Sequence, residues 1–70
     1  MDIKDLENRF TYHQPKSTIT QSTYETIRAM CLDVATTLNE CCPESREKSL
    51  AITHLEEVVF WANASIARNE

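Results

Sequence analysis

The chain has 70 residues, 41% hydrophobic side chains and a formal net charge of −4. A single core of this size rarely supplies more than about 3–5 kcal/mol without disulfides, a metal or a partner subunit. Seven basic residues scattered among eleven acidic ones do not form the basic stripe that binding to a nucleic-acid polymer requires. We therefore expect one small domain over residues 1–70 that needs a further source of stability.

The first predicted element is an N-terminal arm over residues 1–21. Residues 2–9 have the pattern of a short helix, with Asp2 as its cap and two apolar residues on one side. Residues 10–22 are expected to be irregular, because Pro15 interrupts them and their many serines and threonines favour turns and caps over helix interiors.

A helix is predicted over residues 22–42. Ser22 and Glu25 fit the S-x-x-E capping box immediately before an apolar run. The apolar positions that follow are spaced by four, three, four and three residues, which is one stripe of a helix: Ile27, Cys31, Val34, Leu38 and Cys41. Pro43 ends this helix, because the residue before a proline is biased away from helical geometry.

The last predicted helix occupies residues 43–68, begun either by Pro43 or by Ser45 as cap. It repeats the apolar spacing at Ala51, Leu55, Val58, Ala62 and Ile66. Two amphipathic helices joined by a short link predict an all-α fold, an antiparallel two-helix hairpin behind a short N-terminal helix or arm. The chain contains no glycine, which also favours helices.

Self-association is the expected source of stability. The last helix carries Leu50 and Trp61 on a second stripe and Phe60 on a third side, which is more apolar surface than one partner helix covers. A helix that is apolar nearly all round is buried on all sides, and in 70 residues this requires neighbouring chains. The sequence therefore predicts a homo-oligomer.

Other supports are not expected. Three cysteines, two of them adjacent, together with a charged start that does not resemble a signal peptide, predict free thiols in a reducing cytoplasm. No apolar run approaches the ~20 residues that cross a bilayer, so no membrane partner is expected. No histidine or cysteine pair has the spacing of metal ligands, and no cofactor motif occurs.

The polar residues point to binding rather than catalysis. No motif of a hydrolase or protease occurs, and His54 beside Glu57 is typical of a helix surface, so an enzyme is not expected. Each cation taken alone is typical of a solvated surface. Aromatic rings beside cations nevertheless suit a nucleotide, since bases stack on rings while arginine and lysine pair with phosphate.

Four stretches carry a resemblance to a known family: "NRFTYHQPK", "YETIR", "CCPESREKSLAITHLEE" and "WANASIARNE". Over residues 8–70 the chain resembles the helical-hairpin family of phage anti-defence proteins, which includes the anti-CBASS sponges and the hairpin part of the Thoeris anti-defence sponges. The resemblance implies a protein that captures cyclic nucleotide second messengers without cleaving them, in the cytoplasm of an infected bacterial host. The length of the chain suits the anti-CBASS type.

The small anti-CBASS members form compact hexamers, so the resemblance implies a homohexamer. It implies cyclic dinucleotides such as 3′,3′-cyclic GMP-AMP bound between paired subunits, and cyclic trinucleotides bound at three-subunit sites. Tyr12 is assigned to base stacking and Arg68 to phosphate, with His13, Lys16 and Arg28 as neighbours of that pocket. A second, trinucleotide site is assigned to Arg46, Lys48, Ser49 and Thr53, and the oligomer interface to Leu50, Phe60, Trp61 and Asn63.

Three alternatives stay open on the sequence. The chain could be a helical interaction module that inhibits a host protein through its apolar faces. It could be a sponge for the cyclic ADP-ribose derivatives that the Thoeris relatives bind. It could also be an enzyme that degrades the messenger.

Overall fold

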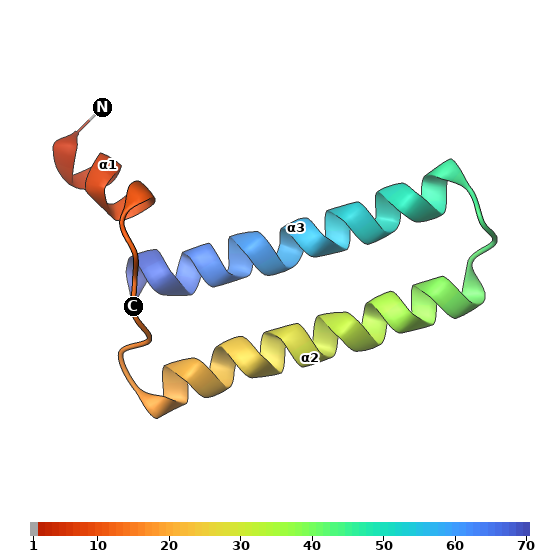
Figure 1. The fold of residues 1–70 in the computed structure, drawn as a ribbon, viewed down its shortest axis with the longest axis horizontal. Coiled ribbons are helices and arrows are strands. Elements are labelled where there is room, and N and C mark those ends of the chain that lie inside the picture. The colour runs from red at the N-terminus through yellow and green to blue at the C-terminus, as the bar shows by residue number, and fades with distance from the viewer. Residues whose placement is uncertain (1) are drawn as a thin grey trace.

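The computed structural model describes residues 2–70 and contains three α-helices, with no strand among these residues. The helices are α1 (Ile3–Phe10), α2 (Thr18–Cys41) and α3 (Arg46–Asn69). α2 and α3 form an antiparallel hairpin, and α1 lies at the end away from the turn, close to the end of α3 (Figure 1). The predicted all-helical fold and hairpin are confirmed. Met1, the first residue of the predicted arm, lies outside the described residues.

The start of α2 differs from the prediction. The helix begins at Thr18, and its N-cap is Ser17, whose hydroxyl accepts from the backbone N–H of Thr20 at 3.2 Å. Ser22 is therefore an interior residue, and the predicted capping box does not start the helix. Pro15 precedes the cap, where its missing N–H and fixed φ do not interfere with the helix.

The caps at the turn follow the second of the two predicted alternatives. Ser45, not Pro43, caps α3, with its hydroxyl accepting from the backbone N–H of Lys48 at 3.1 Å. α2 ends at Cys41, one residue before the predicted end, and α3 ends at Asn69, one residue beyond it. At α1, Asp2 is the cap that the sequence predicted.

The turn is held by a buried lysine. Only 9% of Lys48 is exposed, and its ammonium group donates to the backbone oxygen of Asn39 at 2.9 Å and to the Glu44 carboxylate at 2.5 Å. These contacts join the last turn of α2 to the first turn of α3. They also satisfy the charge of a lysine that burial would otherwise penalise.

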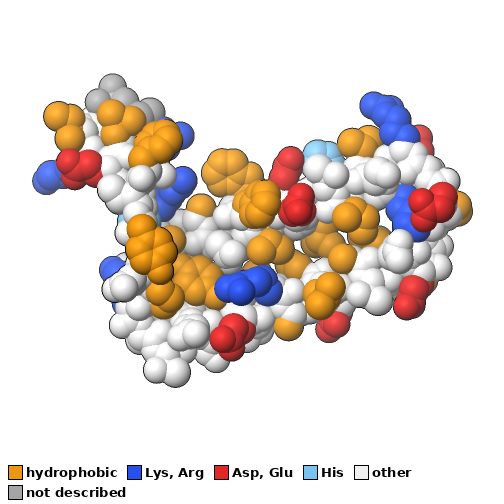
Figure 2. Space-filling model, in the orientation of Figure 1, with side chains coloured by type: hydrophobic (Ala, Val, Ile, Leu, Met, Phe, Trp, Pro, Cys, Tyr) orange, Lys and Arg blue, Asp and Glu red, His pale blue; other side chains and the backbone are white. Residues whose placement is uncertain are grey.

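The described chain has no buried apolar side chain. It exposes 5715 Å², whereas a compact monomer of 8.1 kDa would expose about 4,500 Å². Its radius of gyration is 15.2 Å, against about 11 Å for a compact chain of this length. Apolar side chains gather along the seam of the hairpin and on α1, in contact with solvent (Figure 2).

The seam between α2 and α3 contains most of the predicted stripes. Ile27, Leu38, Leu55 and Ile66 are half-buried there, as their spacing indicates. Two β-branched members of the predicted stripes, Val34 and Val58, are instead exposed. Each long helix packs against a single other helix. It therefore covers only a narrow stripe of that helix, and the edges of both apolar faces stay exposed to solvent. No described helix is long and apolar enough to cross a membrane.

Candidate functional site

A hollow of about 420 Å³ lies at the open end of the hairpin, and we call it the end hollow. All three helices and the link between α1 and α2 contribute to its walls. It brings together four of the five residues predicted to bind ligand. Its walls are Asn8, Arg9, Thr11, Tyr12, His13, Pro15, Tyr24, Arg28, Asn63, Ala64, Ala67 and Arg68.

The charge of the end hollow is opposite to that of the whole chain. Its described walls contain three arginines, Arg9, Arg28 and Arg68, and neither aspartate nor glutamate. The chain as a whole carries a net charge of −4. Arginine presents several donors in a planar fork that matches the oxygens of phosphate. The hollow is therefore locally basic on a chain that is acidic overall.

One hydrogen bond holds α1 over the end of α3, and a second joins α1 to the link that follows it. The side-chain amide of Asn8 donates to the backbone oxygen of Arg68 at 3.3 Å. His13 Nε2 lies 2.7 Å from the backbone oxygen of Asn8, and since a carbonyl only accepts, the ring nitrogen donates. His13 thus lies beside the pocket as predicted, and this bond orients the wall that bears Tyr12.

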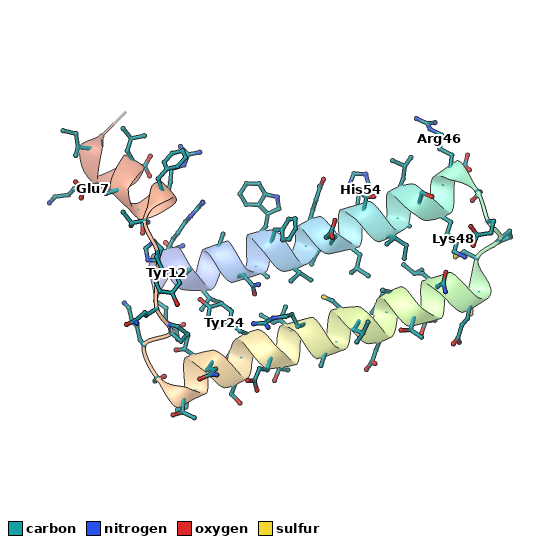
Figure 3. The ribbon with its side chains drawn as sticks, in the orientation of Figure 1. Glu7, Tyr12, Tyr24, Arg46, Lys48 and His54 are labelled. Atoms are coloured by element: carbon teal, nitrogen blue, oxygen red, sulfur yellow. The ribbon has the colours of Figure 1, made fainter. Side chains whose placement is uncertain are left out.

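Tyr12 and Tyr24 reach the hollow from different parts of the chain. Tyr12 is on the link that follows α1 and is 83% exposed, while Tyr24 is half-buried on α2 (Figure 3). Tyr24 was not among the residues predicted to bind ligand. Its spacing from Arg28 was the available signal, because residues four apart lie on the same face of a helix.

Asn63 lines the end hollow, and its Oδ1 atom is buried without a hydrogen-bond partner. The sequence assigned Asn63 to the oligomer interface, and that assignment stays a prediction. A buried acceptor without a donor costs about 1–3 kcal/mol, so a donor from a ligand or a second copy would stabilise the open end.

Lys16 is not a wall of the end hollow. Its ammonium group donates to the backbone oxygen of Glu70. This contact ties the link between α1 and α2 to the end of α3. Among the five residues predicted for the ligand pocket, Lys16 is therefore the one that the structure places outside its walls.

The residues predicted for a second, trinucleotide site do not gather within one chain. The Lys48 ammonium is engaged in the turn, as described above. Arg46 extends outward from the start of α3, away from α2, whereas Lys48 lies on the side of the turn (Figure 3). Ser49 and Thr53 are exposed on α3 and line none of the hollows described in this subsection.

Two further hollows lie on the outer faces of the hairpin. One, of about 510 Å³, is on α3 and is lined by Glu57, Phe60, Trp61, Ala64 and Arg68; we call it the outer hollow. The other, of about 430 Å³, is on α2 and is lined by Thr18, Ile19, Ser22, Thr23, Thr26 and Ile27, with no charged side chain. No three His, Cys, Asp or Glu side chains gather for a metal ion among residues 2–70.

The comparisons with known proteins give one match. The family model described as Acb2/Tad1, hairpin domain, matches residues 1–67. No curated protein and no solved structure matches the chain. The matched range includes α1, α2 and all but the last two residues of α3, and it contains every wall of the end hollow except Arg68.

Proposed function

The chain belongs to the Acb2/Tad1 hairpin family of anti-CBASS and anti-Thoeris sponges, and from this premise we propose that it sequesters cyclic oligonucleotide second messengers without cleaving them. In the cytoplasm of an infected bacterium, a sponge of this kind lowers the free messenger below the concentration that activates the effector. Host CBASS immunity is then blocked although the messenger is still made.

The observation that carries the proposal is the composition of the end hollow. Three arginines line the hollow, and Arg9 pairs with Asp5 at 3.8 Å. Arg28 and Arg68 carry the argument that the hollow attracts phosphates. Two tyrosines offer rings on which bases stack. A ligand that has both phosphates and bases uses both features. Inorganic phosphate or an apolar molecule would use only one.

A cyclic dinucleotide matches this hollow best if two chains meet. Such a ligand repeats one base and one phosphate in near two-fold symmetry, and a two-fold pair of chains presents Tyr12 and Arg68 twice. We propose that the chain acts as a homo-oligomer, with a hexamer expected, and that 3′,3′-cyclic GMP-AMP is a representative ligand. Cyclic trinucleotides would bind where three subunits meet.

The residues that line the end hollow support the proposal that the ligand is held without being cleaved. Cleavage of a phosphodiester needs a general base or nucleophile placed beside the phosphorus. No carboxylate lines the hollow. The Nε2 atom of His13 donates to the Asn8 carbonyl, which leaves only the Nδ1 atom of this ring as a base. The arginines and tyrosines are suited to pairing with phosphate and stacking on bases.

Calorimetry with 3′,3′-cyclic GMP-AMP tests the proposal. We expect saturable binding, followed by recovery of the intact nucleotide when the complex is denatured. A panel with cyclic tri-AMP and a cyclic ADP-ribose derivative then distinguishes the messenger classes. Recovery of a linear product would contradict the sponge mechanism, and no uptake of any compound would contradict the function altogether.

One observation favours the interaction module as the second candidate. The chain exposes twelve large apolar side chains, which a host protein could cover. Self-association covers the same surface without a foreign partner. Measuring the mass of the purified protein in solution separates the two, because an interaction module would remain a monomer until its target is added.

A further inference from the structure

α1 has an apolar stripe that nothing in its own chain covers. Ile3, Leu6 and Phe10 are spaced by three and four residues and therefore lie on one side of the helix. Their exposed fractions are 70%, 40% and 82%, and α1 has no buried residue. An eight-residue helix is too short to be stable by itself in water, so this stripe needs a surface to pack on.

The outer hollow on α3 is an apolar surface that likewise lacks a partner. Trp61 is 67% exposed and Phe60 is 61% exposed, and with Ala64 they form its apolar floor. The large aromatic side chains give a helix stripe more contact area than aliphatic residues would. The same chain thus presents an uncovered apolar ridge on α1 and an uncovered apolar hollow on α3.

The two surfaces of one chain do not meet. α1 is held by Asn8 to the backbone oxygen of Arg68, at the end of α3, and its stripe is exposed. Figure 2 shows apolar side chains on the surface of this helix. Residues 11–17 then separate it from α2, and a seven-residue link spans at most about 25 Å. A helix on such a link can pack on a neighbouring chain, which is the arrangement of exchanged elements in oligomers.

The exposed area indicates that the partner is a second copy. The chain exposes about 1,200 Å² more than a compact monomer of its mass. Standard interfaces bury about 800 Å² on each partner, so this excess is enough for a stable contact between copies. Because the ridge and the hollow belong to the same chain, two or more identical chains satisfy both without a foreign protein.

We propose that the stripe of Ile3, Leu6 and Phe10 packs into the outer hollow of a second copy, against Phe60 and Trp61. This exchange specifies the contact behind the self-association proposed above, on which it rests. It also closes the outer side of Arg68, which lines both the outer hollow and the end hollow. Assembly and completion of the ligand site are then the same event.

The single tryptophan makes the contact measurable without any nucleotide. In the wild-type protein we expect Trp61 emission at short wavelength, protection from acrylamide and an oligomeric mass. Phe10→Lys should move the emission to longer wavelength and reduce the mass, with helix content unchanged in circular dichroism. Gln14→Lys adds the same charge at an exposed position of the link and should change neither quantity.

A mixing experiment identifies the partner. Trp61→Lys removes the only tryptophan and spoils the hollow but keeps an intact α1, whereas Phe10→Lys keeps the hollow. Adding the Trp61→Lys chain to the Phe10→Lys chain should restore the short-wavelength emission and raise the mass. If Phe10→Lys shifts the emission at unchanged mass and mixing restores nothing, α1 packs within its own chain and the proposal is wrong.

Two other results would also overturn it. A wild-type monomer with an exposed tryptophan would show that a second copy does not occupy the hollow. An oligomer of unchanged mass and emission in the Phe10→Lys variant would show that the chains meet through other surfaces. Neither result depends on nucleotide binding, so the sponge function is tested separately.

Discussion

The two ends of the hairpin are built in opposite ways. At the turn, Lys48 is buried and its charge is satisfied by Asn39 and Glu44, and Ser45 caps the helix that follows. At the open end, arginines line a hollow without acids, and the Oδ1 atom of Asn63 is buried without a donor. Satisfied polar groups stabilise a fold, as those at the turn do. The basic walls of the open end agree with the binding role proposed for that end.

The largest expected effect is that of Arg68→Ala. Each copy loses a charge-assisted contact with phosphate worth about 1.5–3 kcal/mol, and a two-fold site loses it twice, so the affinity for 3′,3′-cyclic GMP-AMP should fall by about 100-fold or more. Calorimetry measures this loss. Arg46→Ala removes the same side chain at the turn end and should leave the affinity unchanged; equal losses would remove the distinction between the ends.

Tyr12→Ala should have the next largest effect. Removing a ring on which a base stacks costs about 1–3 kcal/mol of binding free energy, while the oligomer stays intact because Tyr12 is not part of the proposed contact. Tyr12→Phe keeps the ring and should bind nearly as the wild type does. Calorimetry together with native mass separates the two properties. An unchanged affinity in Tyr12→Ala would exclude this residue from the site.

Lys48→Met tests the other end. The methionine keeps an apolar stem but loses the bonds to Asn39 and Glu44, so the free energy of unfolding should fall by about 1–3 kcal/mol. Denaturant unfolding measures the change. The affinity for cyclic dinucleotide should not change once the protein is folded. A loss of affinity at full stability would instead place Lys48 in a binding site.

The smallest expected effect has the opposite sign. Asn63→Leu replaces a buried acceptor that has no partner by an apolar side chain of similar size, which is neutral to stabilising. A gain of about 1 kcal/mol would raise the melting temperature by about 4–8 °C for a domain of this size. Asn39→Leu, an exposed asparagine near the turn, is the matched control. Destabilisation by Asn63→Leu would mean that its amide has a partner in the assembled protein.

Local signals predicted most of the fold. Asp2 and Ser45 are caps, and the three-and-four spacing of apolar residues places both long helices correctly to within a few residues. The start of α2 was misplaced because Ser22 and Glu25 imitate a cap. Ser17, preceded by Pro15, offers a cap five residues before the predicted helix start, and the longer helix makes more backbone bonds.

The walls of the end hollow were predicted in part, and the contacts that were not predicted have a common cause. Tyr12, His13, Arg28 and Arg68 were expected and do line one hollow. Asn8 and Tyr24 were not, because each looks like an ordinary helical residue until the chain folds back. The contact of Lys48 within the turn was not predicted either, because its acceptor, the carbonyl of Asn39, lies nine residues earlier on another helix.

The sequence by itself determined three helices, a hairpin and an excess of apolar surface, since caps and periodicity act over a few neighbouring residues. Only the tertiary structure decided which polar side chains meet at the open end. It also decided that the ammonium group of Lys48 is hydrogen-bonded within the turn. These outcomes depend on contacts such as that between Asn8 and Arg68, sixty residues apart. Local patterns carry no information on such distances, because they are set only when the two long helices pack side by side.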